Sequence, residues 1–513
     1  MAEGQARPDL KVLVVLGHPR RDSLCGALAA SYAEGARAAG LTVQRLDLAD
    51  LTFDLSVRTP SPRDQVLEPD LRRAQALVHW ADHLVFVYPA WWGTLPALLK
   101  GFLDRVLAPG FAFELDEGTP GTWRKLLAGR SAELLVTMDT PAWVYRWIYR
   151  QPGHQAMRRA TLAFCGVAPT FAATFGPVAG STPLARQRWL AAARGAAVRL
   201  PVRLRRSRWR GRAVAWLRIL RLQFYPMTWV AYTVGALEAW RRSGAFSLRI
   251  YGLGYLCVFL AEVLTVLGNE WFDRDTDRLN RNAGPFNGGS RVLVDGGLGP
   301  GSVRRVMAGL ALLLASALSV LAWALPGPAR PEVLVVVALA VLALGYTVPP
   351  LRLVYRGFGE LDVALTHSFA VILCGALLQS GAWWDSRAWL LGVPLFFATL
   401  AAITLSAIPD HDADKAVSKR TLAVLLGPRG AARAAMGFIA AAAASGVAWH
   451  WSGLYAGPGG YAAFLALLHG AVLLRAVRGY LRRGAPCARI DGILALALTF
   501  LLWFGLIPLA RLL

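Results

Sequence analysis

Two acidic clusters in the second half of the chain have the composition of a metal site. Asn269, Asp273 and Asp277 are spaced four residues apart, as are Asp410 and Asp414. Residues at this spacing share one face of a helix, where like charges repel unless a cation lies between them. Mg²⁺ takes a few carboxylates together with substrate phosphates, whereas solvated helix ends would explain one acidic group but hardly two. The predicted metal ligands are Asn269, Glu270, Asp273, Asp277, Asp410 and Asp414.

Three loops in the first half of the chain carry a second set of candidate residues. The segment 17–23 (GHPRRDS) offers amides, a hydroxyl, an imidazole and guanidiniums to a phosphate at a helix N-terminus. It lacks the GxGxxG pattern, so a Rossmann-type dinucleotide site is not indicated. The segment 88–93 (YPAWWG) places Trp91 and Trp92 where a planar ring could bind, although paired Trp is more often packing. The third loop is 137–141 (TMDTP).

The pattern of strands and helices predicts that these loops meet. Apolar runs predict strands at 11–17, 42–48, 84–88, 132–138 and about 170–175, with helices such as 24–39 and 96–107 between most of them. Such alternation predicts an α/β doubly wound parallel sheet. Ligands of these sheets bind outside the carboxyl ends of the strands, which is where the three loops lie.

The second half is predicted to be an all-α membrane domain. Of the 513 residues 55% are hydrophobic and only 17% are charged, too apolar for two soluble domains. About nine segments are long enough to span a bilayer, near 222–240, 246–268, 305–325, 332–348, 361–381, 389–408, 431–450, 460–478 and 490–511.

Charge predicts the orientation in the membrane. We expect no signal peptide at the N-terminus, so the first domain stays in the cytosol. The Arg-rich connections then follow the even-numbered segments and face the cytoplasm of a multi-pass cell-membrane protein. The net charge of +23 is explained by this anchoring and by the basic segment 201–220, which favours lipid headgroups over nucleic acid. Five scattered cysteines indicate neither a zinc site nor disulfides. The expected domains are 1–200, a membrane-proximal linker 201–220, and 221–513.

The first domain resembles the NAD(P)H:quinone oxidoreductase family through GHPRRDSLCGAL, YPAWWGTLPALLKGFLDRVLAPGFAF and AFCG. The resemblance implies a flavodoxin-like fold, FMN or FAD as cofactor, NAD(P)H as reductant and a homodimer. It places His18 and Ser23 near the flavin phosphate, Pro89, Ala90, Trp91 and Trp92 at the isoalloxazine edge, and Tyr145 on the substrate side, with His154 as its partner or a surface residue. Thr137 and Thr140 would contact the flavin, although this loop lacks the paired glycines of many relatives and Cys25 stands where they have Asn.

The second domain resembles the UbiA superfamily through three motifs in order, NEWFDRDTD, GYTVPPLRLVYRGFGEL and DHDADKAVSKRTL. The resemblance implies Mg²⁺-dependent transfer of a polyprenyl group from its diphosphate to an aromatic ring. Lys419, Arg420 and Arg221 would neutralise the diphosphate, and Tyr346 joins the acidic residues as a catalytic candidate. The segment GPFNGGSRVLVDG is similar to the naphthoate branch of the superfamily, which implies an acceptor of menaquinone-like type.

Together the two domains predict a bifunctional enzyme that reduces a quinone and prenylates the hydroquinone. A quinone is electron-poor and reacts badly with a carbocation, whereas its reduced form is electron-rich. Two alternatives are a transport protein with a regulatory reductase-like domain, which predicts charged residues within the spans, and a quinone reductase that is merely anchored in the membrane, which leaves the acidic clusters unexplained.

Overall fold

The computed structural model describes residues 10–115, 123–326, 331–382, 386–455 and 457–513. The chain divides into two compact units, one ending at Arg210 and the other beginning at Gly211. Each unit is described by itself below.

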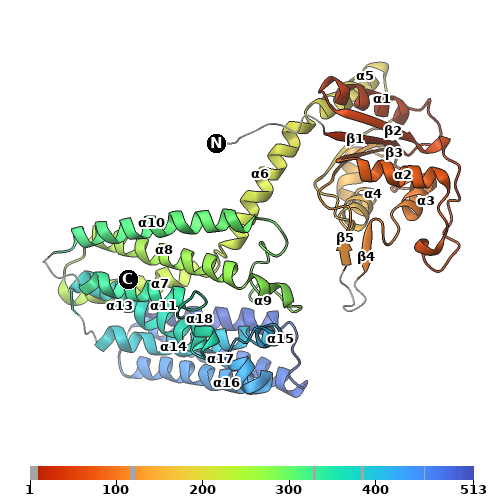
Figure 1. The fold of residues 1–513 in the computed structure, drawn as a ribbon. Coiled ribbons are helices and arrows are strands. Elements are labelled where there is room, and N and C mark those ends of the chain that lie inside the picture. The colour runs from red at the N-terminus through yellow and green to blue at the C-terminus, as the bar shows by residue number, and fades with distance from the viewer. Residues whose placement is uncertain (1–9, 116–122, 327–330, 383–385, 456) are drawn as a thin grey trace. The chain divides into compact units, whose positions relative to one another are not determined.

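The N-terminal unit is built on a five-stranded parallel sheet with the strand order β2-β1-β3-β6-β7 (Figure 1). The strands are β1 (Lys11–Leu16), β2 (Thr42–Asp47), β3 (His83–Pro89), β6 (Ser131–Thr137) and β7 (Thr170–Phe175). All five predicted strands are thus confirmed, and the order is that of the flavodoxin-like fold.

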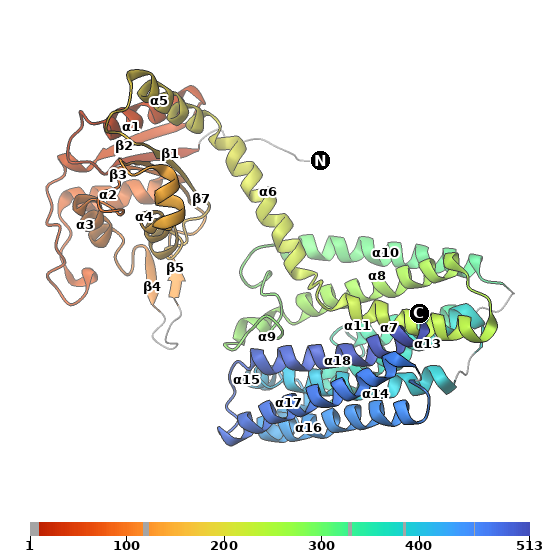
Figure 2. The same cartoon turned by 180° about the vertical axis from the view of Figure 1, so that it is seen from behind.

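Helices cover both faces of this sheet, which explains why its central strands are apolar throughout. Val12 and Val14 face one core with helices α1 and α5, whereas Leu13 and Val15 face the other with α2 and α3 (Figures 1 and 2). The helices are α1 (Leu24–Ala38), α2 (Pro69–Trp80), α3 (Ala97–Val106), α4 (Pro152–Gln155) and α5 (Pro183–Val198), with π-helical turns η3 (Val144–Ile148) and η4 (Ala156–Leu162). A small antiparallel ribbon, β4 (Phe113–Leu115) and β5 (Trp123–Lys125), was not predicted.

The basic segment after the sheet is a helix, α6 (Leu200–Ile219). Its first turns belong to the N-terminal unit, because Leu200 and Leu204 are buried in the core around α1 and α5. Its last turns belong to the C-terminal unit, where Ala215 and Ile219 are buried in an apolar cluster of that unit. Arg203 pairs with the buried Glu133 of β6 at 2.7 Å, so part of the arginine run stabilises the reductase-like unit.

The C-terminal unit is all-helical. Its long helices are α7 (Tyr225–Ser243), α8 (Leu248–Phe272), α10 (Pro300–Ala324), α11 (Pro331–Gly345), α13 (Val371–Ser380), α14 (Ser386–Ser406), α16 (Leu422–Trp451), α17 (Ala462–Arg482) and α18 (Asp491–Leu512). Short helices α9 (Arg274–Leu279), α12 (Gly359–Leu365) and α15 (His411–Ala416) interrupt or extend them. Figure 1 shows α10 running beside α8.

Seven helices of the described chain are long and apolar enough to cross a membrane, instead of the nine predicted. One of the seven is α12 and α13 joined by a π-helical turn, Thr366–Ala370. The other two predicted segments are helices as well, but α11 is only fifteen residues long and α7 ends in Arg241 and Arg242. The described chain thus has helices at all nine predicted positions, and seven of them meet both the length and the hydropathy of a span.

Small residues explain how α7 packs within this unit. A Cβ on Gly235 would lie 1.9 Å from the carbonyl oxygen of Ile372, and one on Gly375 would lie 2.0 Å from that of Tyr232. The backbones of α7 and α13 therefore touch at two glycines, a contact typical of helices packed in membranes.

Candidate active sites

The two acidic clusters face one cavity of about 350 Å³ in the C-terminal unit. Asn269, Glu270, Asp273 and Asp277 line it from the end of α8 and from α9. From the connection after α14 it is lined by Asp410, Asp414 and Lys419, and Arg221 and Tyr346 complete this polar end. The remaining lining is largely apolar and includes Val258, Ala261, Leu339, Val371, Leu494 and Leu498.

Helix ends position the carboxylates as the four-residue spacing predicts. Helix α8 ends at Phe272 and is capped by Asp273, whose N–H donates to the carbonyl of Asn269 at 2.8 Å. Asp277 N–H donates to the carbonyl of Asp273, also at 2.8 Å, so the helical register continues into α9. The second cluster repeats this arrangement, because Asp414 N–H donates to the carbonyl of Asp410 at 2.8 Å.

Lys419 joins the two clusters. Its Nζ lies 3.0 Å from Asp273 Oδ2 and 3.5 Å from Asp414 Oδ1, and the residue is only 7% exposed. The backbone assists, since Lys419 N–H donates to the carbonyl of Asp414 at 3.0 Å. Two segments separated by more than 130 residues are thereby held against each other through one buried ammonium group.

The carboxylates carry more negative charge than Lys419 offsets. Burial and the neighbouring Glu270 and Asp273 raise the pKa of Asp277 to about 8. Burial, opposed by Lys419, raises the pKa of Asp414 to about 7. Asp273 Oδ1 is buried and has no hydrogen-bond partner. A divalent cation fits this set of oxygens, because it would supply the positive charge that the protein does not.

A loop between α9 and α10 closes over the clusters, and the sequence analysis gave it no role in the site. Asp410 accepts hydrogen bonds from Asn280 and Asn287 side chains, each at 2.7 Å, and from Gly288 N–H at 3.3 Å. Both oxygens of Glu270 accept from Ser290, through its N–H and its hydroxyl, at 2.6 Å. The signal that could have identified this loop was Asn287 directly before the paired glycines Gly288 and Gly289, with Asn280 shortly before them.

Gly289 allows the closest approach in this loop. It has a φ of +66°, and a Cβ on it would lie 2.0 Å from Asp277 Oδ2. Only glycine combines this conformation with so small a volume. The backbone thus passes directly over one of the predicted metal ligands.

Four further predicted site residues have the following positions and contacts. Asn269 accepts a short hydrogen bond from the Thr347 hydroxyl, and Arg221 donates to the carbonyl of Phe286 at 3.4 Å. Tyr346 lines the cavity, and burial raises its pKa well above 10. Arg420 is exposed, does not line the cavity, and uses its backbone N–H to bind the carbonyl of Val354 at 3.0 Å. Its part in diphosphate binding stays a prediction that the geometry does not support.

The sequence analysis also missed ionisable groups within the spans. Glu262 lies in the middle of α8, and Asp362 and His367 belong to the span Gly359–Ser380. All three line the cavity. Ionisable residues are therefore present within the spans, where they line a cavity.

In the N-terminal unit the three predicted loops follow the neighbouring strands β1, β3 and β6. The rings of His18 and Trp91 meet edge to face with centroids 5.9 Å apart, which joins the first loop to the second. Ala90 N–H donates to the carbonyl of Thr137 at 2.7 Å, which joins the second to the third. Trp92 has a φ of 52° and is fully exposed beside Gly93.

The first loop turns directly into α1. Ser23 caps this helix, accepting from Gly26 N–H at 3.2 Å and donating to the carbonyl of Arg20 at 2.9 Å. The Cys25 thiol is buried 3.2 Å from the Thr137 hydroxyl, and burial raises its pKa to about 11. Cys25 is thus a packing residue that joins two loops, whereas Pro89 ends β3 and Thr140 lies in the partly exposed third loop.

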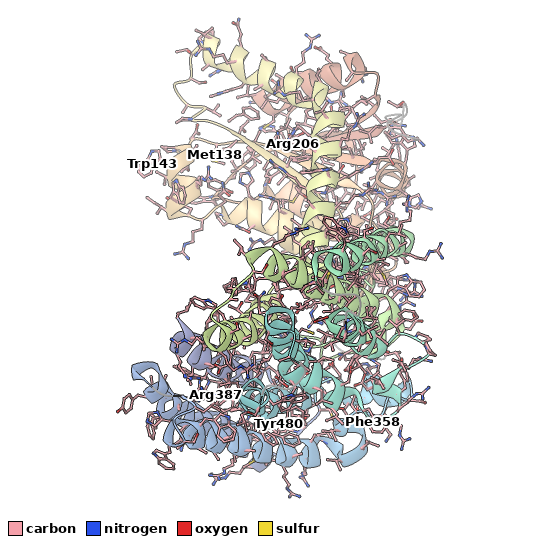
Figure 3. All side chains as sticks on the ribbon, turned by 90° about the vertical axis from the view of Figure 1, so that its left-hand side faces the viewer. Met138, Trp143, Arg206, Phe358, Arg387 and Tyr480 are labelled. Carbon is pink, nitrogen blue, oxygen red and sulfur yellow. The ribbon has the colours of Figure 1, made fainter. Side chains whose placement is uncertain are left out.

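Tyr145 and His154 are brought together as proposed from the sequence. Their rings meet edge to face at 5.3 Å, His154 N–H donates to the Tyr145 hydroxyl at 3.3 Å, and that hydroxyl donates to the carbonyl of Gly93 at 3.2 Å. His154 is buried, and burial lowers its pKa to about 4. Met138 of the third loop is buried, whereas Trp143, which follows that loop, is exposed; both are labelled in Figure 3. Trp91 and Trp92 are exposed, so the second loop presents aromatic surface that suits a planar flavin ring.

Comparison with known proteins agrees with both units. The signature of the UbiA prenyltransferase family matches residues 228–508, more than half of the chain. The chain belongs to this family. The signature of the flavodoxin-like fold matches residues 10–197, and the N-terminal domain is a flavodoxin-like NAD(P)H quinone oxidoreductase domain. The protein is therefore a fusion of a quinone reductase-like domain with a multi-pass UbiA prenyltransferase domain.

Individual relatives match one domain or the other. Human ribosyldihydronicotinamide dehydrogenase [quinone] is 31% identical over 181 residues, which cover 30% of this chain and 77% of that protein. A ribosyldihydronicotinamide dehydrogenase-like protein of Penicillium crustosum is 33% identical over 153 residues, 25% of this chain and 57% of its own length. The apo structure of a UbiA homologue from Aeropyrum pernix K1 is 20% identical, with a TM-score of 0.42, over 58% of this chain and 98% of that one.

Proposed function

We propose that this protein reduces a quinone with NAD(P)H and then transfers a polyprenyl group to the hydroquinone ring. The observation that carries the proposal is the cavity of the C-terminal unit, which combines an acidic end crossed by Lys419 with a largely apolar remainder. A polyprenyl diphosphate has the same division, a charged head and a hydrocarbon chain. The membrane-spanning helices around the cavity suit a lipid-soluble donor and acceptor.

Asp273, Asp277, Asp410 and Asp414, with Asn269 and Glu270 beside them, would hold Mg²⁺ at the acidic end. When bound, the ion offsets the negative charge of the diphosphate and polarises its oxygens. Lys419 and Arg221 line the same end and add positive charge as the leaving group departs. The carbon–oxygen bond of the donor breaks, the ring carbon attacks the allylic cation, and the ring loses one proton.

In the N-terminal domain the loops after β1, β3 and β6 would hold the flavin, which carries two electrons from the nicotinamide to the quinone. His18 and Ser23 lie at the start of α1, where a helix N-terminus favours phosphate. Pro89, Ala90, Trp91 and Trp92 with Thr137 and Thr140 would bound the ring. Tyr145, held by the carbonyl of Gly93 and backed by the neutral His154, would place a hydroxyl beside the bound quinone.

Further parts of the proposal follow from charge and from relatives. The Arg-rich connections favour an orientation with the N-terminal domain and the acidic clusters in the cytoplasm of a cell-membrane protein. The similarity to quinone reductases favours a homodimer through the N-terminal domain. A naphthoquinone is the acceptor that the segment 284–296 favours.

The coupling between the two activities is the experiment that tests the proposal. Purified protein should prenylate an oxidised naphthoquinone only when NAD(P)H is present, and should prenylate the chemically reduced hydroquinone under anaerobic conditions without it. Product from oxidised quinone without nicotinamide would contradict a supply role for the reductase. Absence of prenylated product under all conditions would favour a membrane-anchored reductase or a regulatory subunit of a transport system.

A further inference from the structure

The cavity is also lined by two carboxyl groups that belong to neither acidic cluster. Glu262 on α8 and Asp362 on α12 line it and are 8% and 6% exposed. Glu262 Oε1 accepts from the Thr228 hydroxyl at 2.9 Å, whereas Glu262 Oε2 is buried without a partner. Asp362 Oδ2 is likewise buried without a partner. Two carboxyl groups within apolar spans thus each keep one oxygen that receives no hydrogen bond from the protein.

Such an arrangement is costly unless a ligand completes it. A buried oxygen without a hydrogen-bond partner destabilises the fold, and more strongly if it is charged. Ionisable groups within membrane spans are rare and mark functional sites by default. Neither Glu262 nor Asp362 forms an ion pair in the described part of the chain that would account for its position. The oxygens therefore call for a hydrogen-bond donor from the cavity.

His367 adds a third acceptor to the lining of the cavity. Its Nδ1 lies 3.0 Å from the carbonyl oxygen of Val363. A carbonyl can only accept, so this contact assigns the ring hydrogen to Nδ1 and leaves Nε2 as an acceptor.

Five Thr and Ser hydroxyl groups that line the cavity are already used. Thr228 donates to the Glu262 carboxylate, and the other four donate to backbone carbonyls: Thr265 to Ala261, Thr366 to Asp362, Thr399 to Leu395 and Ser406 to Ile403. The Tyr225 hydroxyl, which interacts electrostatically with Glu262, is buried without a partner among the described residues but does not line the cavity. These threonine and serine hydroxyls of the lining are thus occupied as donors, whereas the carboxyl oxygens remain free to accept. Hydroquinones and quinones differ in this respect, because a hydroquinone has two O–H donors and a quinone has only carbonyl acceptors.

We propose that Glu262 and Asp362 bind the hydroxyl groups of the aromatic acceptor, so that the cavity selects the reduced ring over the oxidised one. His367 accepts from the same ligand or from a water beside it. The inference rests on the proposed prenyl transfer and names the residues that make it specific for a hydroquinone. An acceptor lacking a hydroxyl leaves a buried carboxyl oxygen unpaired, and this is the kind of mismatch that gives strong discrimination.

The test uses the full-length protein in lipid nanodiscs and two probes, 1,4-dihydroxynaphthalene and its monomethyl ether, under anaerobic conditions with geranyl diphosphate. Glu262→Met and Asp362→Leu remove the oxygens and keep most of the bulk. Each should raise the KM and the Kd for the diol about 10–100-fold, the effect of losing a hydrogen bond to a charged group. The KM for geranyl diphosphate and the quinone reductase rate should change less than twofold.

Selectivity between the probes separates recognition from a structural role. The wild-type protein should favour the diol over the monomethyl ether about tenfold or more, and one of the two variants should lose this preference. Asp362→Asn, which keeps an acceptor oxygen, should recover part of the affinity. Thr404→Val is the matched control, since the Thr404 hydroxyl is equally buried and unpartnered but does not line the cavity.

Two results would overturn the inference. One is an unchanged preference for the diol in both variants, and the other is an equal rise of KM for the diol and for geranyl diphosphate, which indicates a deformed cavity. The equilibrium Kd for the diol is measured without turnover. A wild-type protein that binds the diol through these oxygens but forms no product would refute the prenyl transfer alone.

Discussion

The two predicted sites of this protein differ in how far the chain completes them. In the membrane domain the carboxylates are buried, crossed by Lys419 and covered by the loop that carries Asn280, Asn287 and Ser290. In the N-terminal domain the predicted flavin bed is open, with Trp92 fully exposed. Contacts within the protein thus hold the acidic side chains in place, whereas the aromatic surface of the predicted flavin bed is left uncovered by the protein. Substitutions should therefore act on chemistry in the first site and on cofactor affinity in the second.

Asp273→Asn should have the largest effect. Charge stabilisation by a metal ion is worth several kcal/mol, so prenyl transfer should fall about 10³-fold while quinone reduction stays within twofold. Asp275→Asn, on an exposed side chain two residues away, is the matched control and should retain activity. Parallel assays of both reactions measure the effect. Mg²⁺-dependent transfer by Asp273→Asn above a tenth of the wild-type rate would show that the cation acts elsewhere.

His154→Gln tests whether the buried His154, which contacts Tyr145, makes the stability of the N-terminal unit depend on pH. Burial lowers the pKa of His154 from 6.5 to about 4, so the folded state binds fewer protons than the unfolded state in this window. The free energy of unfolding of the N-terminal unit should therefore fall between about pH 6.5 and 4, by up to about 3 kcal/mol.

Hydrogen exchange of β6 and β7 peptides, corrected for intrinsic rates, measures this loss of stability. The free energy of unfolding of the His154→Gln variant should depend less steeply on pH. The pH dependence that remains should include protonation of the buried His83 of β3, whose pKa burial lowers to about 3. His79→Gln, on an exposed histidine, should behave as wild type. If the stability of wild type and of His154→Gln falls equally steeply with falling pH, the pKa of His154 is not lowered by burial.

Gly289→Ala probes how tightly the loop covers the acidic site. The new Cβ would overlap Asp277 Oδ2, so the loop must move and prenyl transfer should fall about 10–100-fold. Gly296→Ala is the matched control, because Gly296 also has a positive φ, +72°, but nothing lies within 4 Å of its Cβ position. Backbone strain of about 1–2 kcal/mol is common to both variants. If the two variants lose activity equally, strain rather than contact with Asp277 is responsible.

Trp92→Ala should have the smallest effect. Aromatic pairing is worth about 0.5–1.5 kcal/mol, so the Kd for flavin should rise up to about tenfold, with a slower reductase and unchanged thermal stability. Trp209→Ala, on another exposed tryptophan, controls for the loss of an indole. Full flavin content and a normal rate in Trp92→Ala would assign Trp92 to something other than the ring bed.

The parts of the structure that sequence predicted are those set by local pattern. The strands were found because continuous apolar runs such as 12–16 are buried on both faces. The acidic residues were found because helical hydrogen bonds preserve the four-residue spacing of Asp273 and Asp277 after α8, and of Asp410 and Asp414 after α14. The nine helical segments were located correctly from their apolar runs; within the described residues α7 and α11 fall short of the hydropathy or length of the other spans, and close packing at Gly235 joins α7 to α13.

The parts that sequence did not predict depend on contacts between distant segments. Nothing local shows that Lys419 reaches Asp273, or that Asn280 and Asn287 reach Asp410. Glu262 was a visible exception, a single carboxylate within the apolar run 246–268, and it was passed over because its neighbours look like an ordinary span. Proximity in sequence to Lys419 does not bring Arg420 into the lining of the cavity, so its part in diphosphate binding stays a prediction.

The loop from Asn280 to Ser290 is held by five hydrogen bonds to the carboxylates of Asp410 and Glu270, in addition to those of Asn282 to the carbonyls of Pro409 and Cys487. Its position and the charge inside the cavity are consequently linked equilibria, and such linkage is reciprocal. If closing the loop tightens the hold on a ligand by some factor, the ligand must tighten the closure of the loop by that same factor. The protection of the loop amides against exchange, with and without donor, would then report binding energy directly, even in a variant that catalyses nothing.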